Sequence, residues 1–222
     1  MGYPASIWIF NQMQVQQLLD ELKDFGKQKF LSTYAKEIQS AFKEKYGVKD
    51  FETDIDLYFS SEEVQDGSSL IIDMLKLSGA KRIDLSEFNY FQYKTGFYQA
   101  IERDFNEKHN SKFFPAFKLF TNLFRWDHNE RIFGLTILDD VASIQGFVDT
   151  KSVNDGATEA ISMLSELKII KSNKLLFTND GWNDFGAVDS FKVEIYKIAR
   201  DKIYISIKEA MEKEMALLLC TL

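Results

Sequence analysis

The chain has 222 residues, 45% of them hydrophobic and 27% charged, and its formal net charge is −7. This length and composition are typical of one large or two small globular domains, and the twenty phenylalanines indicate an aromatic-rich core. The negative charge argues against broad binding to nucleic acids or anionic membranes, because neutralising phosphates requires a surplus of Lys and Arg.

A single cysteine, Cys220, excludes an intramolecular disulfide framework and a cysteine-based zinc site, and it fits a reducing compartment. No apolar run approaches the roughly 18–20 residues of a membrane span, and the N-terminus lacks the pattern of a secretory signal. No Gly-rich phosphate-binding loop occurs. We therefore expect a cytoplasmic protein that contacts no membrane and needs no cofactor or metal.

The balance of helix formers and helix breakers predicts a mainly α protein with a small β component. Only two prolines occur, while Lys, Glu, Leu and Ala are abundant. In residues 1–50, apolar side chains recur at helical intervals, which predicts two helices, the second of which ends at Gly47. Residues 51–59 alternate apolar and acidic side chains and predict a strand.

A Phe-rich central region follows this predicted strand. Residues 68–79 predict a capped helix that a glycine ends, and residues 81–88 predict a short extended segment. Phenylalanines then recur at helical intervals and predict two further helices that continue to Trp126, the second with Pro115 in its first turn. These elements complete a predicted N-terminal, mostly helical domain over residues 1–127.

A polar break at residues 127–131 marks the predicted start of a C-terminal domain over residues 128–222. Residues 202–208 alternate with period 2, which leaves a strand insertion as an alternative inside the last helix of this domain. The elements predicted in the domain are a short helix over 135–144, a turn over 146–151, a long helix over 154–168, a hairpin over 169–178 and a long helix over 188–219.

The segment from Leu135 to Gly181 resembles the winged-helix superfamily in its order of helix, helix and hairpin. In a winged helix that reads DNA, the second of these helices lies in the major groove and the hairpin, or wing, touches the backbone. The resemblance therefore implies DNA binding as one function. The apolar residues that carry it are Leu138, Val141 and Ile144 on the short helix, and Ala157, Ala160, Ile161, Leu164 and Leu167 on the long one.

The charge of this segment argues against DNA binding. Between Arg131 and Ser190, five basic residues stand against nine acidic ones, and only Lys171 and Lys174 in the predicted wing form a locally basic pair. We therefore predict that the long helix docks a protein partner, with DNA contact through the wing as the alternative. Its predicted outward face consists of Asp155, Thr158, Glu159, Ser162, Met163 and Glu166.

Residues 68–125 resemble a first, degenerate winged helix. Two such units in a small acidic protein resemble the kite proteins, tandem winged-helix subunits that bind the kleisin of SMC-type chromosome complexes and are usually dimers. The resemblance rests on architecture and charge, and no residue motif carries over. It implies a non-enzymatic interaction or regulatory subunit, while a winged-helix DNA-binding regulator remains the alternative.

Two acidic residues in the predicted strand suggest a second alternative, a nucleotidyltransferase-like protein. Asp54 and Asp56 resemble the Asp-x-Asp strand of that family, in which two carboxylates on one face of a strand hold metal ions, and Asp84 could supply a third carboxylate. The Gly-Ser loop that the family needs upstream is missing, and solvent exposure of both side chains explains the pattern equally well. Arg103 and His109 match the loose spacing of HEPN ribonucleases, a spacing common in charged helices.

The predicted last helix also suggests self-association. A helix over residues 188–219 would be about 48 Å long at roughly 1.5 Å per residue, which is longer than one small domain can cover. Its apolar face could be buried by a second copy in a homodimer or by the N-terminal helices of the same chain.

Overall fold

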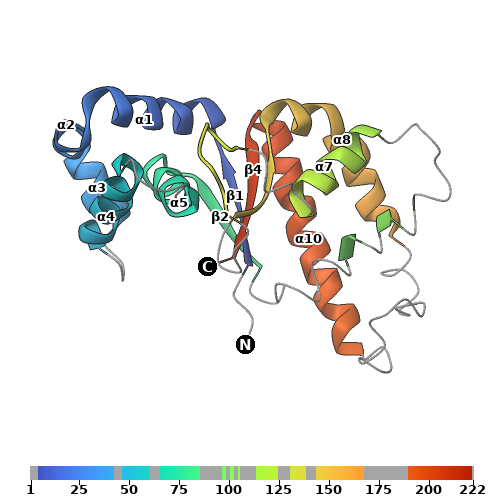
Figure 1. Ribbon diagram of the computed structural model, residues 1–222. Helices are drawn as coiled ribbons and strands as arrows, with labels where there is room; N and C mark the ends of the chain where they lie inside the picture. The colour runs from blue at the N-terminus through green and yellow to red at the C-terminus, as the bar shows by residue number, and fades with distance from the viewer. Residues whose placement is uncertain are drawn as a thin grey trace.

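The computed structural model describes residues 5–42, 47–60, 66–85, 97–98, 101–102, 105, 114–124, 131–138, 144–167 and 190–221. The described part is mainly helical with a small antiparallel sheet of strand order β2-β1-β4-β3 (Figure 1). β1 and β4, which lie near the two ends of the chain, form the central pair, with Ile7 opposite Leu219. The strands are β1 (Ala5–Phe10), β2 (Lys81–Leu85), β3 (Ile144–Val148) and β4 (Ala216–Thr221).

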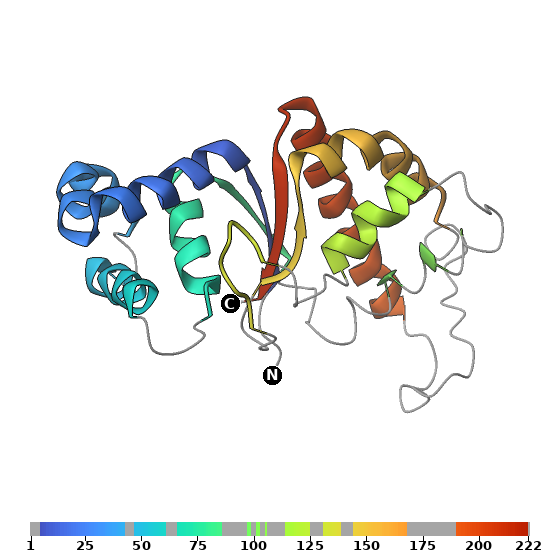
Figure 2. The same ribbon diagram turned by 45° about the horizontal axis from the view of Figure 1, so that its top comes forward.

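Helices cover both faces of the sheet and give the molecule three layers (Figures 1 and 2). One face carries α1 (Gln12–Phe25), α2 (Lys27–Thr33), α3 (Ala35–Ala41), α4 (Gly47–Phe59) and α5 (Ser68–Leu77). The other face carries α7 (Phe114–Phe124), α8 (Thr150–Glu166) and α10 (Ser190–Glu212).

The alternation of side chains along the central strands divides the apolar interior into two cores. Ile7 and Ile9 belong to the core beneath α7, α8 and α10, whereas Trp8 and Phe10 belong to the core beneath α1–α5. Leu217 and Leu218 of β4 divide between the two cores in the same way. Every residue of β1 and of β4 is therefore buried.

Glycine allows α7 to approach its neighbours closely. A Cβ atom on Gly146 of β3 would lie 1.9 Å from the carbonyl oxygen of Leu123, and one on Gly156 of α8 would lie 2.5 Å from that of Pro115. Both distances are far below van der Waals contact. These two glycines therefore determine how closely α7 packs on the sheet and on α8.

Several predicted elements are confirmed. The N-terminal apolar stripes are helical as predicted, but they form three helices, α1, α2 and α3, in place of two, and α3 ends at Ala41 and not at Gly47. Residues 68–77 form α5, after which Gly79 adopts a φ of +69°. β2 corresponds to the predicted extended segment, and α7 carries Pro115 in its first turn. α8 corresponds to the predicted long helix, although it begins at Thr150.

Other predictions are wrong. Residues 51–59 are helical and belong to α4, which Gly47 begins with a φ of +65°. In the predicted short helix over 135–144, residues 135–138 are not helical and residues 139–143 lie outside the described residues, while Ile144 begins β3 where the helix was expected to end. α10 ends at Glu212 and includes residues 202–208, so the proposed strand insertion is absent and β4 occupies what was predicted as the end of a helix.

The predicted domain boundary near residue 127 lies outside the described residues. β1 and β2 precede it, whereas β3 and β4 follow it, so both parts of the chain contribute strands to one sheet. Both parts also contribute side chains to each of the two cores. The predicted wing over residues 169–178 lies outside the described residues as well, and the winged-helix assignment stays a prediction.

Candidate functional site

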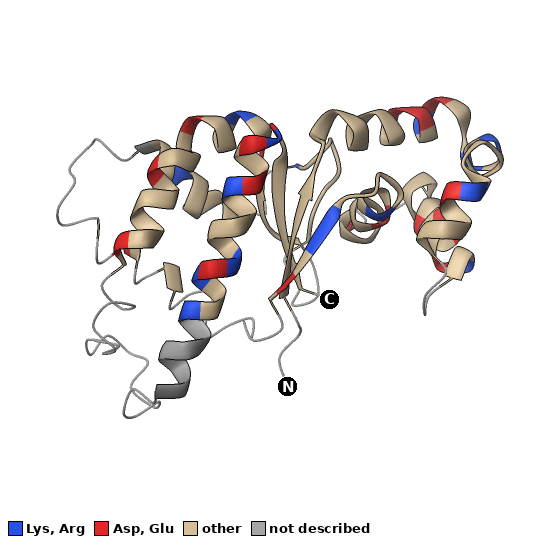
Figure 3. Cartoon of the chain, turned by 180° about the vertical axis from the view of Figure 1, so that it is seen from behind, with Lys and Arg blue, Asp and Glu red and all other residues tan. Residues whose placement is uncertain are grey.

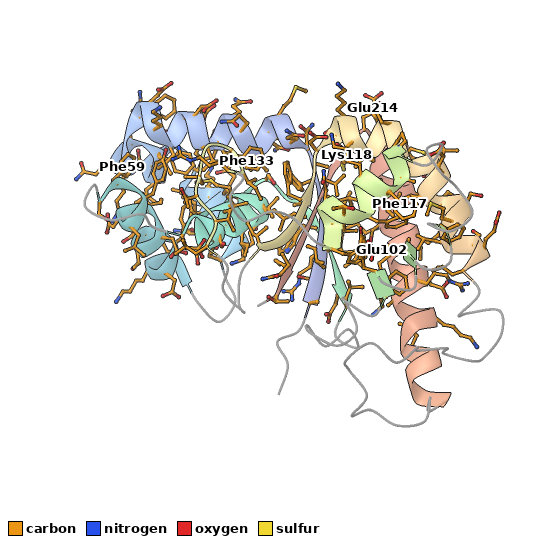
Figure 4. All side chains as sticks on the ribbon, turned by 45° about the vertical axis from the view of Figure 1, so that its right-hand side comes forward. Phe59, Glu102, Phe117, Lys118, Phe133 and Glu214 are labelled. Carbon is orange, nitrogen blue, oxygen red and sulfur yellow. The ribbon has the colours of Figure 1, made fainter. Side chains whose placement is uncertain are left out.

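A polar groove lies at the edge of the sheet where α1 and α8 begin. β1 leads into α1 through Asn11 alone, and β3 leads into α8 through Asp149 alone. Both strands end on the same side of the sheet, and the two helices leave it in opposite directions because they cover opposite faces (Figure 2). The turn between α10 and β4, which contains Lys213 and Glu214, completes the groove, and Figure 4 labels Glu214 there.

Hydrogen bonds fix the first turns of both helices beside the groove. The Asn11 side chain accepts a bond from the backbone N–H of Gln14 at 3.1 Å, and that of Asp149 accepts one from Ser152 at 2.6 Å. The backbone N–H of Thr150 donates to the side-chain oxygen of Gln12 at 3.0 Å, which joins the two helix starts. The groove therefore has walls of defined relative position.

The groove is acidic. Its lining contains two lysines, Lys151 and Lys213, and Lys213 is paired with Glu209 outside the groove lining at 2.7 Å. Among the described residues, Asp24 and Asp155 have no ion-pair partner. The six carboxylates of the lining belong to Asp20, Glu21, Asp24, Asp149, Asp155 and Glu214.

Neutral groups on α1, and Tyr34 between α2 and α3, donate hydrogen bonds to some of these carboxylates. The side-chain amide of Gln16 donates to Asp20 at 2.9 Å. Glu21 accepts hydrogen bonds from the Tyr34 hydroxyl and from the Gln17 amide, and these bonds lower the pKa of its carboxyl. The Glu21 side chain is therefore ionised at neutral pH, and the same hydrogen bond raises the pKa of Tyr34 to about 12.

The structure places most of the predicted outward face of α8 in solvent. Asp155, Thr158, Ser162 and Glu166 are exposed, as predicted. Met163 is wrongly assigned to that face, because it is only 2% exposed and packs in the core shared with α7 and α10. The exposed and half-buried members do not all gather at one site: Asp155 lines the groove, Glu159 is half-buried, and the Thr158 hydroxyl lies 3.6 Å from the sulfur of Met211 on α10.

Lys171 and Lys174, the predicted basic pair of the wing, lie outside the described residues, as do Arg103 and His109. Sequence reasoning missed the α1 wall of the groove. The polar, acidic face of α1 is visible in the sequence, but its position opposite the start of α8 depends on the pairing of β1 with β4.

The predicted carboxylate site on Asp54, Asp56 and Asp84 does not form. Because the segment is a helix, Asp54 and Asp56 lie on different sides of it. Asp56 pairs with Lys27 at 2.7 Å, and Asp84 is exposed on the edge strand β2. Within the described ranges, no group of three acidic, His or Cys side chains can hold a metal ion.

Asp54 instead interacts electrostatically with a different carboxyl group, that of Asp73 on α5. Asp73 is 5% exposed, and its carboxylate accepts a hydrogen bond from the Lys76 ammonium at 2.8 Å. Burial, followed by the hydrogen bond and charge of Asp73, raises the pKa of Asp54 to about 7. Burial also raises the pKa of Asp73, against the opposing effect of Lys76.

Cys220 has a structural environment. Its sulfur accepts a hydrogen bond from the indole N–H of Trp8 at 3.2 Å and lies 3.3 Å from the Ser6 hydroxyl. Burial raises the pKa of the thiol. A buried thiol without a cationic neighbour in contact is a poor nucleophile.

None of the helices in the described part of the chain combines the length and apolar character needed to cross a membrane. Comparisons of the chain with protein-family models, curated proteins and solved structures give no match.

Proposed function

We propose that this protein is a non-enzymatic interaction subunit that docks a basic segment of a protein partner in the groove between α1 and α8. The observation that carries this proposal is the excess of six carboxylates over two lysines in a groove with fixed walls. Complementary charge accelerates encounter and selects partners, so Lys- and Arg-rich segments are the favoured occupants.

The groove also offers groups that suit an extended chain. Gln16 and Gln17 present amides beside the carboxylates, and such groups can bond to the backbone of a bound segment. The Met13 side chain is 80% exposed at the groove and supplies a flexible apolar contact. The kite-type resemblance, with a kleisin as partner and a homodimer as assembly, remains a more specific hypothesis within this proposal.

The described surface gives little support to the DNA-binding alternative. Basic residues on α10 and β2 are interspersed with acidic ones (Figure 3). Lys81 pairs with Glu209, and Arg200 pairs with Asp201. Because such pairing neutralises basic side chains locally, these elements present no continuous basic surface for phosphates.

A peptide array tests the proposal. Intact protein is applied to peptides rich in Lys and Arg, with acidic and neutral peptides of equal length alongside. A triple variant, Asp20→Asn with Asp24→Asn and Asp155→Asn, should weaken binding to basic peptides at least about tenfold, because it removes half of the groove's carboxylates.

The matched control changes the net charge equally away from the groove, through Glu52→Gln, Asp84→Asn and Asp201→Asn. It should bind basic peptides nearly as well as the natural chain. Equal losses in both triple variants would show that net charge alone attracts the peptides, and an absence of salt-sensitive binding would refute the groove as a docking site. An electrophoretic shift assay at low salt with genomic DNA tests the DNA-binding alternative directly.

A further inference from the structure

The edge strand β2 has one side that no other described strand pairs with. It pairs antiparallel with β1, and among the described residues it is the last strand on its side of the sheet. Seen from behind, β2 lies in front of the other strands, with its basic and acidic residues in view (Figure 3). An open strand edge offers backbone N–H and C=O groups to a further strand.

The strand carries charges of opposite sign on either side of a central apolar residue. Arg82 and Asp84 are exposed and lie on one face of the sheet, while Ile83 is half-buried on the other. The guanidinium of Arg82 lies over the ring of Trp8, its cross-strand neighbour, with 5.8 Å between the guanidinium carbon and the ring centre. Within the described part of the chain, neither Arg82 nor Asp84 forms an ion pair.

These charges favour one register of pairing between two copies of β2. Two identical strands that pair antiparallel about a twofold axis place one residue opposite its own copy. With Ile83 at the axis, each Arg82 lies opposite Asp84 of the second copy. With Arg82 or Asp84 at the axis, two like charges meet directly. Opposite charges across a strand pair stabilise it and like charges destabilise it, so the register about Ile83 is the favoured one.

Charged residues on an edge strand can also serve to prevent pairing. A run of charges of one sign would repel a second copy in every register. In β2, by contrast, Ile83 separates Arg82 from Asp84, so repulsion in the two neighbouring registers is combined with attraction in one. Lys81 adds no unpaired charge, because it already pairs with Glu209 of α10.

α10 supplies an apolar contact beside the same edge. Because Glu209 pairs with Lys81, this side of α10 lies next to β2. Ile205 lies one helical turn before Glu209 on the same side, and it is 51% exposed. A twofold axis perpendicular to the sheet would place α10 of the second copy on the same face of the extended sheet, where it would shield Ile205 from water.

We propose that two copies of the chain join through antiparallel pairing of their β2 strands, with Ile83 at the twofold axis. The two four-stranded sheets then form one continuous sheet. Two ion pairs, each between Arg82 of one copy and Asp84 of the other, fix the register. This interface is independent of the groove and of its proposed partner, and its centre is the edge strand and not the last helix.

Exchange of charges within β2 tests this inference in the intact protein. Light scattering of the natural chain at micromolar concentration should give the mass of two chains. Arg82→Asp and Asp84→Arg each place like charges opposite one another in both pairs, so each variant alone should weaken the dimer at least about tenfold. Mixed in equal amounts, the two variants again carry complementary charges and should form a heterodimer.

The mixture separates loss of the interface from damage to the fold. Arg82→Asp also removes the contact with Trp8, and a chain damaged in this way could not be restored by the other variant. Lys36→Asp on α3 changes the net charge equally at an exposed position and should leave the dimer intact. The inference is overturned if the natural chain is monomeric throughout the micromolar range, if both single variants stay dimeric, or if the mixed variants do not associate.

Cysteine crosslinking reads the register directly. In the proposed register, the Cβ atoms of residue 83 in the two copies are about 5 Å apart. Those of residue 81 are about 13 Å apart, at roughly 3.3 Å per residue. On mild oxidation, Ile83→Cys should therefore form a disulfide-linked dimer and Lys81→Cys should not, while the buried Cys220 does not compete. Equal crosslinking of the two variants would rule out this register.

Discussion

Replacement of Gly146 by alanine should strongly destabilise the fold. The added Cβ would meet the backbone of Leu123 at 1.9 Å from its oxygen and 2.5 Å from its carbonyl carbon. Ordinary contact between such atoms is about 3.4 Å, so α7 and β3 would have to separate by roughly 1.5 Å. Neither atom belongs to a flexible side chain, so relief requires displacement of a helix packed on a buried strand.

Overpacking of a core usually costs about 1–3 kcal/mol, and this rigid clash falls at or above the upper end. We therefore expect Gly146→Ala to lower the free energy of unfolding by about 3 kcal/mol or more, measured by urea denaturation followed by circular dichroism. Gly79→Ala is the control: no atom lies within 4 Å of its added Cβ, and only the φ of +69° is unfavourable. It should cost about 1 kcal/mol. A loss below 1 kcal/mol for Gly146→Ala would refute the close packing of α7 on β3.

Three further outcomes follow from other contacts. The raised pKa of Asp54 means that its protonated carboxyl stabilises the fold, fully below about pH 4, and that this stabilisation is lost as pH rises to about 7. The full pKa difference corresponds to about 4 kcal/mol, and the partial exposure of Asp54 reduces the expected loss to about 2 kcal/mol. Denaturation across this range should show that decline in the natural chain and a smaller one in Asp54→Asn, whereas equal slopes would contradict it. Cys220 should react with a thiol reagent only after unfolding, and rapid reaction of the native protein would show that the thiol is accessible. Asp149→Ala removes the cap of α8 and should cost about 1 kcal/mol in the same denaturation assay; no loss would mean that the bond to Ser152 contributes nothing.

The two central strands were missed because both of their faces are buried. Residues 5–10 and 216–221 are apolar apart from Ser6 and Thr221, and alternation appears only when one face of a strand meets water. The second run follows strong helix formers and was absorbed into the preceding helix. The turn at Glu214 separates this helix, α10, from β4. Glu214 is a non-glycine residue with a φ of +53°, and nothing in its identity predicts that conformation.

Residues 51–59 show how two periodicities can compete in a short segment. The apolar residues alternate with acidic ones, but Phe51 and Ile55 are also four apart. The helix buries that pair against the neighbouring helices, while Leu57 and Phe59, which alternation would have buried, remain about half exposed. Packing against neighbouring elements decided the outcome, and a single segment carries no information about those neighbours.

The candidate sites were predictable only in part. The sequence drew attention to Asp54, but its partner Asp73 is on another helix and depends on tertiary packing. The acidic face of α8 was predicted from helical spacing, and Asp155 does line the groove. Predicting the α1 wall of the groove would have required knowing that β1 and β3 end on the same side of the sheet. The homodimer stays a prediction that light scattering of the full chain addresses; the described part of α10 already buries Ile203 and Ile207 within the chain.

Amide chemical-shift mapping tests the proposed interaction most directly. A nitrogen-15-labelled sample of the intact protein is titrated with a short peptide of alternating Lys and Arg, at low and at physiological salt. The groove predicts saturable shifts gathered in residues 11–24, 149–155 and 213–214, which weaken at the higher salt. Shifts scattered over the acidic surface, or centred on α10 and β2, would contradict it.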